Sequence, residues 1–262
     1  MNKIIKFNNM KIGIMQPYFF PYIGYFQLIN AVDKFIIYEN LNYIVDGWMH
    51  KNRILIKKDE ISYIKIHIMR KSSNSKISET KLVKDYYWKR KILNAVKQNY
   101  CGASNYADFF PLFEKMIKAD FDDIHNYNSN IIINICEYLN IGTNIQFDNK
   151  NYLSLEKELD AKYKGKKTQN SVDADINKKT ARVIEICKKE GSDCFINAIG
   201  GEKLYIKEKF IRFGIDLSFI QTGNIKYKQI NDSFSPNLSI IDVIMHCGRE
   251  HTKNLLNEFK LV

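Results

Sequence analysis

The order of apolar and polar residues along the chain predicts short strands separated by helices. Residues 11–15 (KIGIM) and 34–38 (KFIIY) are apolar, β-branched or aromatic, which favours strands, and residues 23–31 between them have helical spacing. A strand, a short helix and a second strand in so short a stretch have the size of a βαβ unit. We therefore expect the two strands to be parallel.

The next two apolar segments predict an antiparallel pair. Residues 47–56 (GWMHKNRILI) are followed by residues 61–68 (ISYIKIHI), in which Ile64, Ile66 and Ile68 alternate with Lys65 and His67. Such alternation is typical of a strand with one buried face. We expect this pair to extend the sheet that the first two strands begin.

The spacing of apolar residues changes after Ser72 from the alternation of a strand to the spacing of a helix. We expect residues 75–150 to form a helical lobe. Residues 81–100, 107–119 and 123–140 have apolar residues at helical spacing. The side chains that we expect to be buried in this lobe are Leu82, Trp88, Ile92, Val96, Phe109, Phe113, Ile117, Ile132, Ile135 and Leu139.

The second half of the chain returns to an α/β pattern. Residues 154–175 are polar and rich in lysine, which predicts a loop that is mobile until a ligand arrives. A helix over residues 180–190 follows, with Gly191 as its C-cap. Residues 194–221 predict a second strand–loop–helix–strand unit, and residues 239–247 a final helix.

The order of these elements predicts the fold class and the domain organisation. We expect a Rossmann-like α/β fold with a mainly parallel sheet and a helical insertion lobe. Residues 10–262 are expected to be a single domain, and residues 1–9 an N-terminal extension, with Met10 an alternative start.

Composition narrows the class of protein. The 262 residues are 45% hydrophobic, enough for a full core, and no run reaches the roughly 18 to 20 apolar residues of a membrane span. The N-terminal residues lack the apolar core of a signal peptide, so we expect a cytoplasmic protein. The five cysteines include no CxxC pair and no Cys/His cluster, which predicts reduced thiols and no zinc or other metal site.

The formal charge of +11 is compatible with nucleic-acid binding, but its distribution argues against it. The basic residues are dispersed, except around residues 162–167 and at Lys178–Lys179. We interpret them mainly as a solvated surface and, second, as an attraction for a phosphorylated small substrate. Nucleic acid is not an expected partner.

The first segment with candidate chemistry follows the first strand. Residues 19–25 (FFPYIGY) are similar in spacing to the F-x-P-x-H-x-G-H turn of HxGH-class nucleotidylyltransferases, whose histidines contact phosphates at a helix N-terminus. Tyr22 and Tyr25 stand in the histidine places, and a tyrosine is neutral at pH 7. A shared fold is one interpretation, and an aromatic core at the sheet edge is the other.

Two further segments suit ligand binding. Trp48, His50 and Asn52 are expected to share a strand face, with Arg53 on the other, and these residue types can bind sugar hydroxyls or phosphate. The alternative is a surface strand with one packed tryptophan. Asn197 ends an apolar strand and is thus expected at the carboxyl edge of the sheet, where α/β proteins bind ligands.

Two shorter patterns complete the candidates. The glycine pair Gly200–Gly201 would let the backbone approach a ligand closely, although a plain turn is the alternative. Ser239 and Asp242 predict a capping box at the start of the last helix. The chain has no GxGxxG, GxxxxGK[ST], GxSxG or HExxH motif, so the residues indicate a ligand-binding α/β domain and no specific cofactor or reaction.

These segments together resemble the WbqC-like protein family, from about Lys11 to the C-terminal helix. The family is encoded among surface-polysaccharide and O-antigen genes, so the resemblance implies work on nucleotide-linked or lipid-linked sugars. The positions that match the shared segments are Gln16, Pro17, Phe20, Pro21, Tyr25, Asn52, Arg53, Asn197, Gly200, Gly201, Tyr205, Pro236 and Asp242.

The leading hypothesis is a transferase that acts on a nucleotide-activated amino sugar in lipopolysaccharide O-antigen biosynthesis, by acyl or aminoacyl transfer to the amine. Arg53, Asn52 and the glycine pair would bind the nucleotide and stabilise the oxyanion, and His50 or Asp242 would be the base. The alternatives are nucleotidyl or adenylate transfer on an HxGH-like fold, and a non-catalytic sugar-binding or assembly subunit. The identity of the acyl donor and the oligomeric state stay open.

Overall fold

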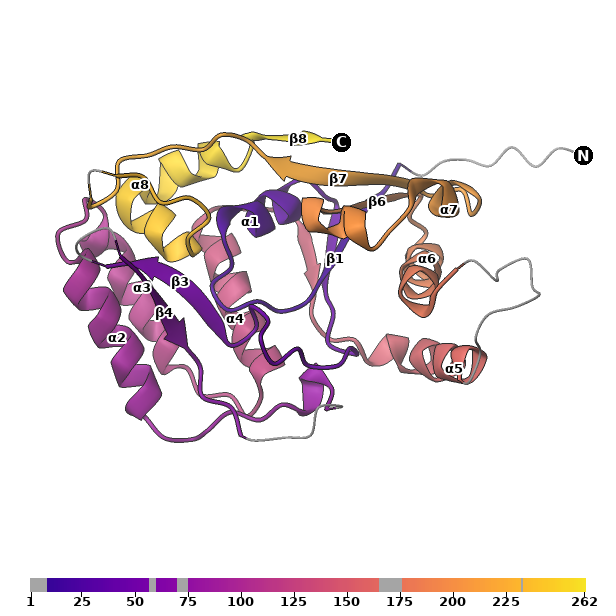
Figure 1. The fold of residues 1–262 in the computed structure, drawn as a ribbon, viewed down its shortest axis with the longest axis horizontal. Helices are drawn as coiled ribbons and strands as arrows, with labels where there is room; N and C mark the ends of the chain where they lie inside the picture. The colour runs from indigo at the N-terminus through magenta and orange to yellow at the C-terminus, as the bar shows by residue number, and fades with distance from the viewer. Residues whose placement is uncertain (1–8, 57–59, 70–74, 165–175, 232) are drawn as a thin grey trace, which may run out of the picture.

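The structure is a computed structural model that describes residues 9–56, 60–69, 75–164, 176–231 and 233–262 (Figure 1). Of the expected N-terminal extension, only Asn9 falls within these ranges. The last residues of the basic segment 162–167 lie outside them.

A six-stranded sheet forms the centre of the fold. Its spatial order is β5 (Asn144–Gln146), β2 (Lys34–Ile37), β1 (Lys11–Met15), β6 (Cys194–Ala198), β7 (Asp216–Thr222) and β8 (Phe259–Leu261). The first five strands are parallel, and β8 is antiparallel to β7. Counted along the chain, these six strands have the order 3-2-1-4-5-6, which is the Rossmann order. The predicted α/β fold with a mainly parallel sheet is confirmed, and the specific relation to HxGH enzymes stays a prediction.

The connections between the parallel strands agree with the predicted βαβ units. Helix α1 (Ile23–Asn30) joins β1 to β2, and the short helices η3 (Ile199–Lys203) and α7 (Lys207–Ile211) join β6 to β7. Helix α6 (Lys178–Glu190) ends at Gly191, whose φ of 68° is left-handed, as expected of a glycine C-cap.

Helices cover both faces of the sheet. One core includes residues of α1, α4 (Ile124–Tyr138) and α8 (Ile240–Leu255), and lies on one side of the strands. A second core lies on the other side, and α6 contributes Val183, Ile184 and Cys187 to it. Helix α8 is interrupted at Gly248, whose φ of 71° is not helical, so its first segment ends at the predicted residue 247 and a second helical segment follows.

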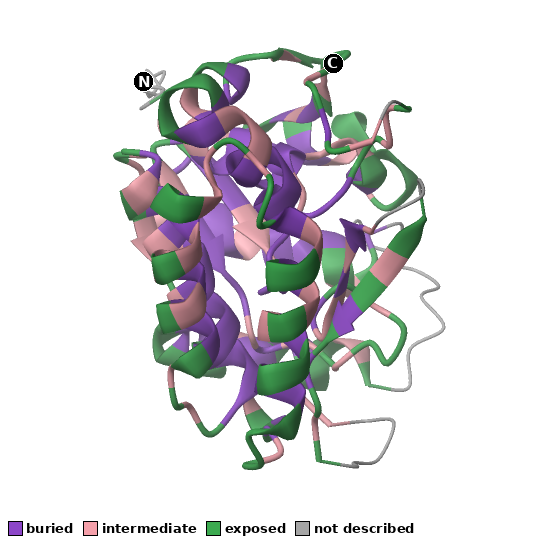
Figure 2. Ribbon diagram, turned by 90° about the vertical axis from the view of Figure 1, so that its left-hand side faces the viewer, coloured by how far each residue is buried: buried purple, intermediate pink, exposed green. Residues whose placement is uncertain are grey.

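The helical lobe consists of α2 (Tyr87–Tyr100), α3 (Tyr106–Lys118) and α4, preceded by the short η1 (Ile77–Glu79). Figure 2 shows helices with exposed outer faces and buried inner faces. All ten side chains that the periodicity predicted to be buried are buried here, from Leu82 to Leu139. The lobe returns to the main sheet through β5.

Two predictions of local structure are wrong. Strands β3 (Lys51–Leu55) and β4 (Ile61–Lys65) pair antiparallel, but they form a separate two-stranded sheet and do not extend the central one. Residues 153–163 form helix α5, preceded by η2 (Lys150–Tyr152), where a loop was expected. Leu155, Leu159 and Tyr163 recur every four residues and pack beside α6, so a short apolar stripe stabilises a mostly polar helix. Residues 165–175 lie outside the described ranges.

The loop between β1 and α1 is held by hydrogen bonds to its carbonyl oxygens. The Tyr25 hydroxyl donates to the Gln16 carbonyl (2.9 Å). The Asn128 side chain, from α4, donates to the carbonyls of Pro17 (2.9 Å) and Met49 (2.7 Å). Because Asn128 is fully buried, these bonds replace the water that the two carbonyls would otherwise bind.

The next residues of the loop are bound from β3 and from the start of α8. The buried Asn52 donates to the carbonyls of Phe19 (2.9 Å) and Phe20 (2.7 Å), and the Ser239 hydroxyl donates to Phe20 as well (2.8 Å). Phe20 has a φ of 41°, an uncommon conformation for a residue with a side chain. Surrounding contacts must over-determine such a conformation for it to persist.

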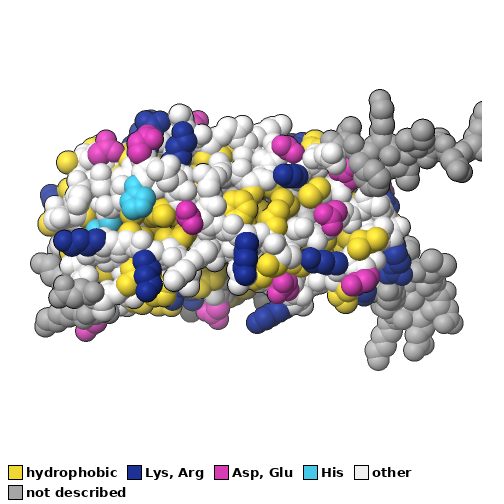
Figure 3. All heavy atoms as spheres, turned by 90° about the horizontal axis from the view of Figure 1, so that it is seen from above, with side chains coloured by type: hydrophobic (Ala, Val, Ile, Leu, Met, Phe, Trp, Pro, Cys, Tyr) yellow, Lys and Arg dark blue, Asp and Glu magenta, His cyan; other side chains and the backbone are white. Residues whose placement is uncertain are grey.

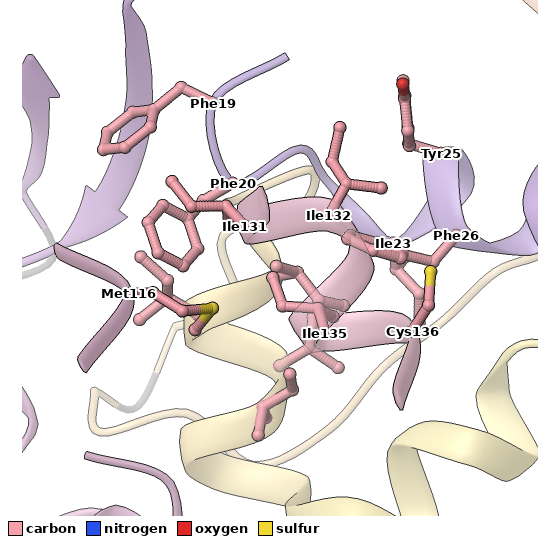
Figure 4. Packing of buried hydrophobic residues seen from close by; sticks show 14 of the residues in the cluster. Phe19, Phe20, Ile23, Tyr25, Phe26, Met116, Ile131, Ile132, Ile135 and Cys136 are labelled. Carbon is pink, nitrogen blue, oxygen red and sulfur yellow. The ribbon is translucent and has the colours of Figure 1, made fainter. Parts of the chain in front are cut away.

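Aromatic packing completes the support of this loop. The rings of Phe19 and Phe20 are fully buried, and Phe20 lies 5.3 Å from the ring of Phe113. Figure 4 shows Phe20 beside Ile131 and Met116, with the hydroxyl of Tyr25 directed away from the cluster. The loop is therefore a rigid, buried support and not a flexible turn.

We expect Asn52→Ala to destabilise the protein by about 2 kcal/mol, because the Phe19 carbonyl loses its side-chain donor and the Phe20 carbonyl loses one of two. Urea unfolding followed by circular dichroism measures the change. Asn94→Ala, at an exposed position of α2, is the matched control and should not lower the stability. Equal midpoints for Asn52→Ala and the unmodified protein would contradict this role.

Candidate functional site

Strands that follow β1 in the chain are added first on one side of it (β2, β5) and then on the other (β6, β7, β8), so the strand order reverses between β1 and β6. These two strands part at their carboxyl ends. Their pairing stops at Gly13 and Ile196, although β1 continues to Met15 and β6 to Ala198. By contrast, β1 stays paired with β2 as far as Met15, the last residue of β1. Strand β6 stays paired with β7 as far as Ala198, the last residue of β6. In open α/β sheets, ligands bind outside the carboxyl ends of the strands at this reversal.

We call the surroundings of this point the carboxyl-edge site and define it by residues at the ends of these strands and beside them. They come from the end of β6, from the loops after β1, β2 and β6 and from the helices beside them. The members are Gln16, Tyr18, Glu39, His125, Asn197, Gly200, Gly201 and Tyr205.

The turn after β6 is packed closely against Asn197. This side chain is 7% exposed, and its oxygen accepts from the Ala198 backbone N–H (2.8 Å). A Cβ at Gly201 would lie 2.9 Å from the Asn197 amide nitrogen and 3.2 Å from the Phe219 ring, whereas a Cβ at Gly200 would meet nothing. Asn197 and the glycine pair thus lie at the carboxyl edge, as the sequence predicted, and only Gly201 is sterically required.

The residues of the β1–α1 loop differ in burial: some are half-buried at the surface, and others are buried and support the loop. Gln16 is half-buried, and its amide makes no hydrogen bond to another described residue. Pro17 and Phe20 are buried, and Tyr25 is 1% exposed with its hydroxyl bound to Gln16. Burial raises the pKa of Tyr25 well above its usual value, so it stays a neutral donor.

Tyr22 lies at the start of α1. Its ring is close enough to Gly24 that a Cβ there would be 2.4 Å away, and burial raises its pKa while the Thr222 hydroxyl opposes the rise. The nearby Tyr18 also has a raised pKa, because it is buried and lies beside Tyr22. Tyr22 and Tyr25 are the two tyrosines that align with the histidines of the HxGH turn, and of these only Tyr22 is near the surface.

A glutamate and a histidine at the edge were not singled out from the sequence. His125, 2% exposed in the first turn of α4, donates from Nε2 to the Phe147 carbonyl (2.8 Å) and lies 3.7 Å from Glu39 Oε2. Its Nδ1 is buried with no partner among the described residues. Glu39 is the second residue after β2 and directly follows the predicted strand 34–38, so the rule that identified Asn197 could have identified it as well.

Burial raises the pKa of Glu39 above its usual value. His125 lowers it, while the carboxylates of Asp123 and Asp148 raise it further. The Glu39 side chain keeps 17% of its surface exposed. A partly exposed carboxyl group with a raised pKa at a ligand-binding edge has the properties of a general base.

A buried ion pair lies on the α6 side of the sheet, next to the end of β2. Arg182 donates from Nε and Nη2 to the two carboxylate oxygens of Glu156, which also accepts from the Tyr38 hydroxyl (2.7 Å). Burial raises the pKa of Tyr205, and the charge of Arg182 opposes that rise. Both carboxylate oxygens of Glu156 accept hydrogen bonds, and such bonds offset the cost of burying the charges.

The second predicted cluster lies away from the central sheet. Asn52 faces the β1–α1 loop, whereas the Arg53 guanidinium lies 5.5 Å from the Trp48 ring and donates to the Asn237 carbonyl (2.7 Å). The prediction that Trp48 and Asn52 share a face opposite Arg53 is wrong, because β3 begins only at Lys51 and strand alternation does not reach Trp48.

His50 precedes β3, and its side chain contacts Tyr43 in the segment before the hairpin. Its Nδ1 lies 2.7 Å from the Tyr43 hydroxyl. Burial, followed by the charge of Lys51, lowers the pKa of His50, so its ring is neutral at pH 7. Its role as a base stays a prediction.

Asp242 is fully buried in α8 and accepts three hydrogen bonds. The donors are the hydroxyls of Tyr100 (2.8 Å) and Tyr227 (2.7 Å) and the amide of Gln229 (2.9 Å). The predicted capping box is therefore wrong in its second half: the Ser239 hydroxyl caps the helix, but its backbone N–H donates to Arg53. The catalytic role of Asp242 stays a prediction.

Other features of the described residues bear on possible ligands. They include no group of three or more His, Cys, Asp or Glu side chains placed to hold a metal ion. Within the same residues, no helix has both the length and the apolar composition needed to cross a bilayer. On the face shown in Figure 3, basic and acidic side chains are interspersed.

We expect Gly201→Ala to destabilise the protein by about 1–3 kcal/mol, since the added methyl group would displace Asn197 or Phe219. Gly200→Ala is the matched control and should be nearly neutral, because its methyl group would enter open space. Thermal unfolding of both variants measures the difference. Equal melting temperatures for the two variants would refute the close packing of Gly201.

Comparison with known proteins places this arrangement in a family. The uncharacterized protein Rv1507c of Mycobacterium tuberculosis is 25% identical over 244 residues, which cover 92% of this chain and 95% of that protein. No solved structure matches the chain significantly. The family model described as the WbqC-like protein family matches residues 16–254, which include the β1–α1 loop, both strands of the hairpin and most of α8. The chain belongs to the WbqC-like protein family.

Proposed function

We propose that this protein is a transferase that binds a nucleotide-activated amino sugar at the carboxyl-edge site and transfers an acyl or aminoacyl group to the sugar amine. The observation that carries the proposal is the parting of β1 and β6 at the reversal of strand order, beside a loop with a fixed backbone. A nucleotide needs such an opening, with rigid backbone donors at its margin. The occurrence of family members among surface-polysaccharide genes supports a sugar as the substrate.

The start of α1 is suited to the diphosphate of such a ligand. No side chain caps its first turn, and of its N–H groups that of Tyr25 donates to the Tyr22 carbonyl, so the remaining N–H groups and the helix dipole would favour an anion there. Gln16 and Asn197, on either side of the parted strands, would bind sugar hydroxyls through their amides. The phenols of Tyr18 and Tyr205, both neutral at pH 7, would offer hydroxyl donors or a ring face.

Glu39 is the base that this geometry favours over His50 and Asp242. The sugar amine would attack the acyl carbonyl, a C–N bond would form, and the bond from the carbonyl carbon to the donor's leaving group would break. The amine proton would pass to the Glu39 carboxylate, and the leaving group would depart as a thiolate or alkoxide that takes a proton from water. The N–H groups of Gly200 and Gly201 would stabilise the oxyanion.

The test is to incubate the protein with dTDP-, UDP- and GDP-linked amino sugars together with acyl-CoA or aminoacyl donors, and to measure product mass. We expect one combination to yield a sugar nucleotide heavier by the acyl group. No mass change with any pair would refute the transferase. Thermal stabilisation by a sugar nucleotide without turnover would instead support a binding subunit, and pyrophosphate release from a nucleoside triphosphate would support nucleotidyl transfer.

With the active pair identified, Glu39→Gln should lower kcat by about 100-fold or more and leave KM nearly unchanged, because the base is lost and not the binding contacts. In the unmodified protein, kcat should fall as the pH falls through the raised pKa of Glu39, since only the carboxylate accepts a proton. Glu60→Gln, an exposed position beside β4, is the matched control. An unchanged pH profile in Glu39→Gln would exclude Glu39 as the base.

A further inference from the structure

The β3–β4 hairpin and the turn before it present large apolar side chains to solvent. Ile44 is 52% exposed, Val45 64%, Trp48 40% and Tyr63 48%. In Figure 1 the two strands lie at the front of the lobe, and no other element is drawn over them. We call this the hairpin surface and define it by Ile44, Val45, Trp48, Lys51, Arg53, Tyr63 and Lys65.

Contacts show that these residues form one continuous surface. Arg53 and Tyr63 are opposite each other in the antiparallel register, and so are Lys51 and Lys65. The ammonium groups of both lysines lie 5.8 Å from the centre of the Tyr63 ring. Trp48 lies 5.5 Å from Arg53 and joins these strand residues to the exposed turn at residues 44–47.

Three of the residues that define this surface, Lys51, Arg53 and Lys65, are positively charged. Lys51 and Lys65 face each other across the strands, and like charges at directly opposed positions destabilise a sheet. Asp46 lies 3.6 Å from Lys51, but it is 95% exposed, so the pair is weak. A surface that keeps opposed cations beside exposed aromatic rings is suited to an anionic partner.

We propose that the hairpin surface docks the protein on an anionic lipid bilayer. Tryptophan and tyrosine favour the membrane–water interface, where the ring enters the acyl boundary and the polar atom stays hydrated. Lysine and arginine pair with the lipid phosphates and keep their stems along the apolar layer. Ile44 and Val45 lie in the turn at the margin of this surface and insert their side chains.

The aliphatic side chains distinguish a bilayer from a nucleic acid. A single strand would stack on Trp48 or Tyr63 and pair with the cations, but it gives no role to Ile44 and Val45. Each basic residue near an anionic membrane contributes about fivefold in affinity, so three of them give only about a hundredfold. Stable docking therefore depends on apolar insertion as well, and the hairpin surface supplies both.

The test uses the full chain with sedimented vesicles of phosphatidylcholine alone or mixed with phosphatidylglycerol. Ile44→Asp/Val45→Asp should lower binding to the anionic vesicles at least tenfold. Its matched control is Ile206→Asp/Ile211→Asp, on and beside α7, where the two isoleucines are similarly exposed (52% and 62%). This control removes the same apolar surface and adds the same charge at a place that is distant in Figure 1.

A second pair of variants tests the contribution of the lysine charges without changing the apolar side chains. Lys51→Gln/Lys65→Gln should lower binding to anionic vesicles about tenfold or more at low salt, and Lys115→Gln/Lys260→Gln, with the same change in net charge, much less. Circular dichroism confirms that each variant is folded. Because the changed positions are exposed or half-exposed, loss of the fold is not expected.

The possible outcomes separate docking from general attraction by a basic protein. Selective loss of anionic-vesicle binding in the two hairpin variants supports the proposal. Equal losses in hairpin and control variants, or no vesicle binding at low salt, would overturn it. Binding of a fluorescent oligodeoxythymidylate that depends on Lys51 and Lys65 but not on Ile44 and Val45 would overturn it in favour of a nucleic-acid surface. None of these readouts depends on the proposed transferase activity.

Discussion

The hydrogen bonds to the backbone of residues 16–21 are the constraint on which the rest of the structure depends. Asn52 from the hairpin, Asn128 from the lobe and Ser239 from the start of α8 all donate to this one loop. These donors come from parts of the chain that are far apart in sequence. The loop therefore cannot take its conformation until the hairpin, the lobe and the last helix are in place, and it then fixes the margin of the carboxyl-edge site.

The dependence of the β1–α1 loop on these donors explains why the segments that resemble the family include buried residues. Asn52 and Ser239 belong to segments that look like ligand-binding motifs, yet both contribute to the support of the loop. Asp242 likewise joins α8 to α2 through Tyr100, within a buried network that costs free energy if any member is lost. A positioned backbone is as necessary for binding as the groups that touch the ligand, because misplacement of a binding group weakens its interaction.

Much of the fold could be predicted from the sequence, because local patterns determine it. The apolar run KIGIM, the isoleucine and phenylalanine positions of the lobe and Gly191 each reflect a rule that acts within one or two turns or strands. Similarly, Asn197 could be placed at the carboxyl edge, since a polar residue at the end of a buried parallel strand lies there. Glu39 satisfies the same rule and was not singled out, because it stands alone and belongs to no motif.

What the sequence alone determined is most of the elements, the parallel pairing of the first two strands and the family, since these depend on periodicity and on short sequence motifs. Tertiary structure decided the direction of each polar side chain: Asn52 toward a carbonyl, Arg53 toward Trp48, and His125 toward Glu39. It also decided that the hairpin stays apart from the main sheet. These outcomes depend on contacts between residues distant in sequence, and a hydrogen-bond donor has no preferred partner until packing brings an acceptor within reach.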